Sequence, residues 1–159
     1  MLKSLWIMRH GLAESNFQSD FTRPLSKVGA QQAMSVARQI KQESEIQPLD
    51  MLVSPFARTQ STAKIVHTKL AIENKFQTDE MLVHYADHKI LGEYLLSCNF
   101  QYLLLVSHMP IVAYLCRYLC PEFITNGFET AQTVRLDFLG EHTLTDRLQI
   151  THAKTYFPD

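Results

Sequence analysis

Apolar segments of strand length alternate with longer amphipathic segments along most of the chain. Runs rich in Leu, Ile, Val and Met predict buried strands at 5–8, 49–53 and 102–106. Apolar residues at helical spacing predict helices over about 27–43, 56–70, 89–98 and 110–120. Because strands that alternate with helices are typical of sheets covered by helices, the pattern favours an α/β fold with a mostly parallel central sheet.

Capping and turn residues refine the ends of this pattern. Ser26 is a suitable N-cap, so the first helix is expected to begin at about Lys27. Toward the C-terminus, alternating apolar and polar residues predict two closing strands at 133–139 and 147–152, with Gly140 between them. These two strands need not run parallel to the others.

Composition and charge narrow the class of protein. At 159 residues the chain has the length of one ordinary domain, and we expect residues 1–159 to form it. Apolar residues make up 46% and charged residues 19%, which disfavours both a disordered chain and a membrane protein. Fifteen basic and sixteen acidic side chains leave a net charge of −1, so no overall field attracts nucleic acid or anionic lipid. We expect a cytoplasmic protein that acts as a monomer.

Polar residues with reactive or cationic side chains follow each of the three strongest strands. The segments concerned are Arg9-His10-Gly11, Ser54 to Arg58, and Ser107-His108. Because the carboxyl ends of parallel strands meet at one edge, we expect the two arginines and two histidines to share a pocket. Guanidinium groups bind phosphoryl oxygens in two-point contacts, and a neutral imidazole can attack phosphorus. One histidine alone would more often be structural, but the recurrence at three strand ends favours a phosphoryl-transfer site.

These residues, in this order, resemble the motifs of the histidine phosphatase superfamily, also called the phosphoglycerate mutase-like family. The matching stretches are Arg9-His10-Gly11, Leu25-Ser26-Lys27-Val28-Gly29, Ser54 through Arg58 to Thr62-Ala63, and His108. The resemblance implies a three-layer α/β/α fold with a mostly parallel central sheet. It implies that His10 is the nucleophile that becomes phosphorylated and that His108 stabilises the transition state. It also implies that Arg9 and Arg58 hold the phosphoryl group.

Three further residues are expected to bind substrate beside these four. Gly11 follows the nucleophile, Asn16 lies in the long polar loop after the first strand, and Ser107 precedes His108. A metal or cofactor is not expected. His84 and His88 have the i, i+4 spacing of helical metal ligands, but no Glu accompanies them in the usual order, so we expect ordinary loop histidines.

Within the superfamily, the chain resembles the SixA-type phosphohistidine phosphatases. The stretches that carry this resemblance are 7–11, 23–25, 52–56 and 106–110. The resemblance implies that the partner is a phosphorylated histidine-containing phosphotransfer protein of a phosphorelay. Glu80 and Asp20 are both candidates for a general acid, although neither lies in a clear motif. Since a phosphohistidine releases an imidazole, which needs protonation less than an alkoxide does, a weak acid motif favours a P–N substrate.

Two other functions remain open from the sequence. The first is the same chemistry on a small phosphorylated metabolite, which requires a strong dependence on one carboxylate. The second is a non-catalytic module that binds phosphohistidine, and such a module has no use for the nucleophile His10.

The three cysteines, Cys98, Cys116 and Cys120, contain no Cys-x-x-Cys pair and are expected to be reduced, buried thiols.

Overall fold

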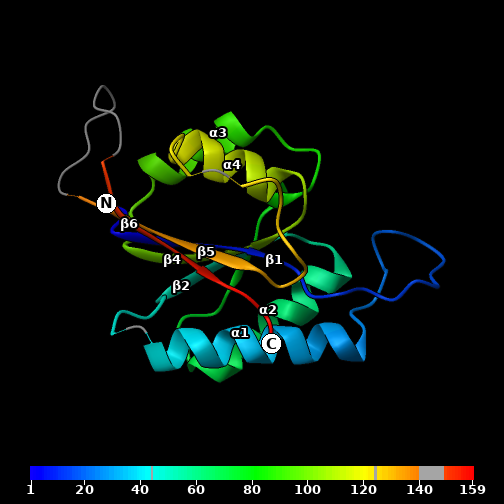
Figure 1. Ribbon diagram of the computed structural model, residues 1–159. Helices are drawn as coiled ribbons and strands as arrows, with labels where there is room; N and C mark the ends of the chain where they lie inside the picture. Colours follow the sequence, from blue (N-terminus) through cyan, green and yellow to red (C-terminus); the bar gives the residue numbers. More distant parts are fainter. Residues whose placement is uncertain (44, 124, 140–148) are drawn as a thin grey trace.

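One sheet forms the centre of the protein in the computed structural model, which describes residues 1–43, 45–123, 125–139 and 149–159 (Figure 1). Within these residues the sheet has six strands in the order β3-β2-β4-β1-β5-β6. The strands are β1 (Ser4–Arg9), β2 (Asp50–Val53), β3 (Gln77–Thr78), β4 (Tyr102–Ser107), β5 (Thr133–Phe138) and β6 (Ile150–Tyr156). β3, β2, β4 and β1 are parallel, whereas β5 and β6 are antiparallel to their neighbours. The predicted mostly parallel sheet is confirmed.

Two pairs of helices cover the two faces of this sheet (Figure 1). The elements are α1 (Lys27–Glu43), α2 (Ala57–Leu70), α3 (His88–Ser97), α4 (Ile111–Leu119) and the short 3₁₀ turn η1 (Glu80–Leu82). α1 packs beside α2 on one face, and α3 packs beside α4 on the other. This arrangement is the three-layer α/β/α fold that the resemblance implied.

The central strands are apolar throughout because each supplies alternate side chains to two cores. In β1, Leu5 and Ile7 lie in the core beneath α3 and α4, whereas Trp6 and Met8 lie in the core beneath α1 and α2. All four side chains are fully buried. Burial of one aliphatic side chain of this size contributes roughly 1.5–3 kcal/mol to folding, so β1 is anchored firmly on both sides.

A close backbone approach joins the end of β1 to the start of α1. Ser26 caps α1 as predicted, because its Oγ accepts a hydrogen bond from the Gly29 amide at 3.0 Å and donates one to the Leu12 carbonyl at 2.7 Å. Gly29 lies directly against the chain at Gly11 and Leu12. A Cβ atom placed on Gly29 would lie only 2.7 Å from the Leu12 amide nitrogen. The Leu-Ser-x-x-Gly stretch therefore fixes how α1 meets the end of β1.

The last strand differs from its predicted position. Residues 147–152 were expected to form it, but β6 begins at Ile150 and continues to Tyr156. Gly140 and Arg147 lie outside the described residues. β6 is an edge strand with mostly half-buried or exposed side chains, so its apolar pattern is weak, and the buried Tyr156 marks its true end. The two closing strands do run antiparallel.

The described residues contain no helix that is long and apolar enough to cross a membrane. The thiols of Cys98, Cys116 and Cys120 are free. Cys116 and Cys120 are buried as predicted, whereas Cys98 is only partly buried because it follows the exposed end of α3.

Candidate active site

The carboxyl ends of β1, β2 and β4 lie side by side, as parallel pairing requires. The His10 amide donates to the Ser107 carbonyl at 3.0 Å, and the Ser54 amide donates to the Val106 carbonyl, also at 3.0 Å. A cavity of about 230 Å³ opens beyond these ends. Its walls include Arg9, His10, Asp20, Arg58, His84 and His108. The four side chains predicted to share a pocket therefore do so.

Hydrogen bonds fix the tautomer of His10, which lies just after β1. Its Nδ1 is 2.7 Å from the Gly11 carbonyl oxygen, and a carbonyl can only accept, so Nδ1 carries the hydrogen. Nε2 of the neutral ring therefore carries a lone pair. Arg58 Nε donates to this Nε2 atom at 3.2 Å. The ring nitrogen with an available lone pair is therefore the one that faces the arginine.

The environment of His10 keeps its ring neutral. Burial of the ring, which is the largest cause, and the charges of Arg58, Arg9 and Arg23 together lower the pKa of His10 to about 4. The hydrogen bond to the Gly11 carbonyl opposes this shift. His10 is only 8% exposed, and its burial has a larger effect on the pKa than the three arginines have. A neutral imidazole is the form that can attack phosphorus.

Arg58 lies in the first turn of α2 and directs its guanidinium group into the cavity. Besides its bond to His10, Nη1 donates to the Asp20 carbonyl at 2.8 Å and to Asp20 Oδ1 at 3.2 Å. Nη2 donates to Asp20 Oδ2 at 3.3 Å. Asp20 thus occupies the fork of Arg58 with a planar anion. A phosphoryl group that enters the cavity must take the place of this carboxylate on the fork.

The first backbone amides of a helix often bind anions, but three of those in the first turn of α2 are already engaged. The amides of Ala57, Thr59 and Gln60 already donate to backbone carbonyls of Phe21 and Phe56. The charge of Arg58 opposes the dipole at the start of α2, and its contacts with His10 and Asp20, rather than an anion shared with these amides, explain its presence there.

Arg9 and His108 complete the polar wall. Arg9 Nη1 donates to the Phe128 carbonyl at 2.6 Å, while its buried Nε has no hydrogen-bond partner among the described residues. The rings of His10 and His108 meet edge to face, with centroids 5.2 Å apart. Burial, with the nearby His10 and Arg58, lowers the pKa of His108 to about 2. His108 is therefore also neutral, and the positive charge of the cavity wall comes from Arg9, Arg23 and Arg58.

Comparison with known proteins bears directly on this arrangement. The family model described as the histidine phosphatase superfamily (branch 1) matches residues 5–84. The phosphohistidine phosphatase SixA of Escherichia coli K12 is 32% identical over 145 residues, which cover 87% of this chain and 89% of that protein. The chain belongs to the histidine phosphatase superfamily. It is accordingly a hydrolase.

Two further similarities agree with this membership of the histidine phosphatase superfamily. A SixA homologue of Haemophilus influenzae is 36% identical over 118 residues, which cover 69% of this chain and 72% of that protein. A solved structure of the protein histidine phosphatase SixA complexed with tungstate superposes with a TM-score of 0.80. That pair is 27% identical and covers 94% of this chain and 95% of the other.

The two candidate acids of this histidine phosphatase lie in different places. Asp20 lines the cavity, but both of its carboxylate oxygens accept hydrogen bonds from Arg58. Glu80 is exposed in η1 and does not line the cavity. The preceding residue, Asp79, is the N-cap of η1, because its side chain accepts a hydrogen bond from the Met81 amide. Neither carboxylate stands free beside His10.

The predicted substrate-binding residues outside the central four also differ in position. The Gly11 amide donates to Thr62 Oγ1 at 3.1 Å, which ties the end of β1 to α2. Ser107 Oγ donates to the Leu82 carbonyl at 2.6 Å and does not line the cavity. Asn16 is exposed and likewise lies off the cavity. Gly11 and Ser107 therefore hold the site together rather than facing its interior.

Sequence reasoning missed His84 and Arg23, which both line the cavity. The ring of His84 contacts His108 edge to face, with centroids 5.5 Å apart. His84 precedes α3, so its spacing from His88 places no two metal ligands on one helix face, and the described residues contain no group suited to hold a metal ion. A histidine in an irregular loop carries no periodic pattern that would have placed it at a strand edge.

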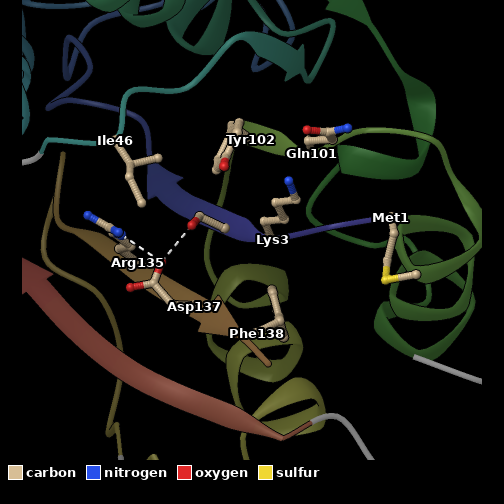
Figure 2. A pocket seen from close by; sticks show the side chains of 9 residues that line it. Met1, Lys3, Ile46, Gln101, Tyr102, Arg135, Asp137 and Phe138 are labelled. Carbon is tan, nitrogen blue, oxygen red and sulfur yellow. Dashed lines mark hydrogen bonds and ion pairs between the residues drawn. The ribbon is translucent and has the colours of Figure 1, made fainter. Parts of the chain in front are cut away.

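A second cavity, of about 610 Å³, lies at the opposite end of β1 and β4 (Figure 2). Its walls include Lys3, Tyr102, Arg135 and Asp137. Arg135 Nε donates to Asp137 Oδ1 at 2.8 Å, and Ser4 Oγ donates to the same oxygen at 2.6 Å. No histidine or cysteine lines this larger cavity. The smaller cavity is therefore the candidate active site.

Proposed function

We propose that the protein is a phosphohistidine phosphatase that removes the phosphoryl group from a histidine-containing phosphotransfer domain of a phosphorelay. The observation that carries this proposal is the lone pair of His10 Nε2, held toward Arg58 in a cavity that Arg9 and His108 also line. The monomeric state and cytoplasmic location expected from the sequence are part of the same proposal.

The proposed reaction has two steps. In the first, His10 Nε2 attacks the phosphorus atom, the P–N bond of the substrate breaks, and the imidazole of the partner protein leaves with a proton from solvent. In the second, water attacks the phosphorylated His10, which releases inorganic phosphate and restores the neutral ring. Arg9 and Arg58 neutralise the charge on the phosphoryl oxygens in both steps. Release of the Asp20 carboxylate from Arg58 frees the fork for those oxygens.

The relatives support this choice of chemistry. The similar proteins of E. coli and H. influenzae are both described as phosphohistidine phosphatases or homologues of one. Tungstate, which the similar solved structure contains, is a tetrahedral oxyanion of the shape and charge of phosphate. An anion of this kind suits a cavity lined by three arginines, Arg9, Arg23 and Arg58.

The positions of the carboxylates support a P–N substrate over a phosphoester. An alkoxide leaving group needs a positioned acid, which typically contributes about 10²–10⁴ in rate. Glu80 is exposed outside the cavity, and both Asp20 oxygens are engaged by Arg58. An imidazole leaves more readily and tolerates the lack of a free acid. The same chemistry on a small phosphorylated metabolite is the alternative that this argument disfavours.

A trapping experiment combined with a rate panel tests the proposal. The wild-type protein should form an acid-labile phosphoenzyme from labelled phosphoramidate or phosphohistidine protein, and His10→Ala should form none and have no turnover. Rates on phosphohistidine protein should exceed those on sugar phosphates and phosphoglycerates. Faster turnover of a small phosphoester would favour the metabolite phosphatase. Binding of phosphohistidine protein without any turnover would instead identify a non-catalytic binding module.

A further inference from the structure

Ser54, the residue that follows β2, is fully buried against the ring of His108. Its Oγ lies 2.7 Å from His108 Nε2. The backbone of Ser54 is held at both ends, because its amide donates to the Val106 carbonyl and its own carbonyl accepts from Thr59 Oγ1 at 2.7 Å. The hydroxyl group is thus fixed in place against one nitrogen of the imidazole.

The direction of this hydrogen bond follows from what else the hydroxyl can reach. Across the described ranges, His108 Nε2 is the sole hydrogen-bond partner of Ser54 Oγ. If Nε2 donated, the hydroxyl hydrogen would be buried without an acceptor, which is unfavourable. If the hydroxyl donates to Nε2, its hydrogen is satisfied and the unpaired donor is instead Nδ1–H of His108, a residue that lines the cavity and can meet a bound anion there. The second arrangement is therefore the stable one, and Nε2 carries a lone pair.

The remaining hydrogen of His108 must then be on Nδ1. The low pKa of His108, about 2, keeps the ring neutral, so it carries one N–H group. Nδ1 is buried and has no hydrogen-bond partner in the part of the chain that the structure describes. Because His108 lines the cavity and its Nε2 is engaged by Ser54, Nδ1 is the ring nitrogen left to meet a bound group. A buried donor without an acceptor suits an anion that enters the cavity.

We propose that Ser54 is a positioning residue that holds His108 in its Nδ1–H tautomer, so that Nδ1 donates a hydrogen bond to an oxygen of the phosphoryl group. This inference rests on the proposed phosphoryl-transfer function. No proton is transferred in the contact, since the neutral ring donates a hydrogen bond and keeps its hydrogen. The role of Ser54 is to keep the hydrogen of the His108 ring on Nδ1 before substrate binds.

The tautomer can be measured without any substrate. Nitrogen NMR of protein labelled at histidine distinguishes protonated from unprotonated ring nitrogens, and wild-type His108 should show hydrogen on Nδ1 and a lone pair on Nε2. Addition of inorganic phosphate should shift the Nδ1–H resonance. Hydrogen on Nε2 in the wild-type protein would overturn the inference. This readout holds even if the physiological substrate is not a phosphohistidine, so the two proposals fail separately.

A double-mutant cycle tests the route through His108. Ser54→Ala should lower kcat/KM roughly tenfold, the usual effect of one lost hydrogen bond, and should weaken inhibition by inorganic phosphate. In a His108→Ala background, Ser54→Ala should cost nothing further. Ser4→Ala is the matched control, because Ser4 is also buried but its Oγ donates to Asp137 at the other end of β1. Additive losses in the cycle, or an equal loss in Ser4→Ala, would overturn the role of Ser54.

Discussion

At the scale of single residues, the guanidinium group of Arg58 is a part of the site whose replacement should cost much activity. It contacts both His10 and Asp20 and is almost fully buried. Arg58→Ala should lower kcat/KM by about 10²–10³, because the charge on the transition state then loses a buried donor. Arg58→Lys should restore little, since an ammonium group lacks the planar fork that spans two acceptors. Steady-state kinetics on one phosphorylated substrate measure both effects.

An arginine on the solvent side of α1 provides the control for this pair. Arg38 is exposed, so Arg38→Ala removes the same side chain without touching the cavity and should retain the wild-type rate. Full activity in Arg58→Lys would remove the planar fork from the mechanism.

The carboxylates give a second prediction at this scale. Asp20→Asn and Glu80→Gln should each cost little on a phosphohistidine protein, because an imidazole leaves with little help. If either residue donates a proton, its loss should grow along a series of aryl and alkyl phosphates with more basic leaving groups. A flat series for both variants would exclude both from proton transfer. A large loss on phosphohistidine itself would contradict the argument for a P–N substrate.

At the scale of elements, the end of β1 and the start of α1 approach closely at two glycines, Gly11 and Gly29. Gly29→Ala should destabilise the protein by several kcal/mol, because its Cβ would overlap the backbone at Leu12, which cannot move aside as a flexible side chain can. Chemical denaturation measures the free energy of unfolding. Lys27→Ala, an exposed change in the first turn of the same helix, should alter it by less than about 0.5 kcal/mol. Equal stability of the two variants would contradict the close approach.

The sequence could predict the elements with a regular apolar pattern, but not the contacts made by irregular loops. Apolar runs at 5–8, 49–53 and 102–106 are long and uninterrupted, so the strands and the convergence of their ends follow from periodicity. The edge strand β6 has few buried side chains and a weak apolar pattern, so its predicted boundaries were wrong. The roles of the four central side chains stay predictions, although the structure brings them together. Contacts such as Asp20 on Arg58 or His84 on His108 arise from irregular loops, which no periodic pattern places.

At the scale of the whole molecule, two buried neutral histidines make stability depend on pH. The unfolded chain binds a proton at each ring as the pH falls through about 6.5, whereas the folded protein does not until about 4 for His10 and about 2 for His108. Because the unfolded state binds more protons in this range, the free energy of unfolding falls as the pH falls. Between pH 7 and pH 5 each ring should account for about 2 kcal/mol of the loss.

Urea denaturation at several pH values measures this dependence. His10→Gln should remove about half of it, since one of the two titrating rings is lost. A free energy of unfolding that stays constant from pH 7 to pH 5 would show that the rings are not kept neutral by burial.

The strand order of the sheet has a consequence for how the protein is made. β1 and β2 leave the ribosome first, but they are not neighbours, because β4 lies between them. Ser4 pairs with Tyr102, nearly a hundred positions later, and then with Asp137 in β5. The nascent chain therefore carries His10 at the end of an unpaired apolar strand until β4 emerges and inserts. Pairings this distant in sequence slow folding, and the waiting strands are a natural target for chaperones.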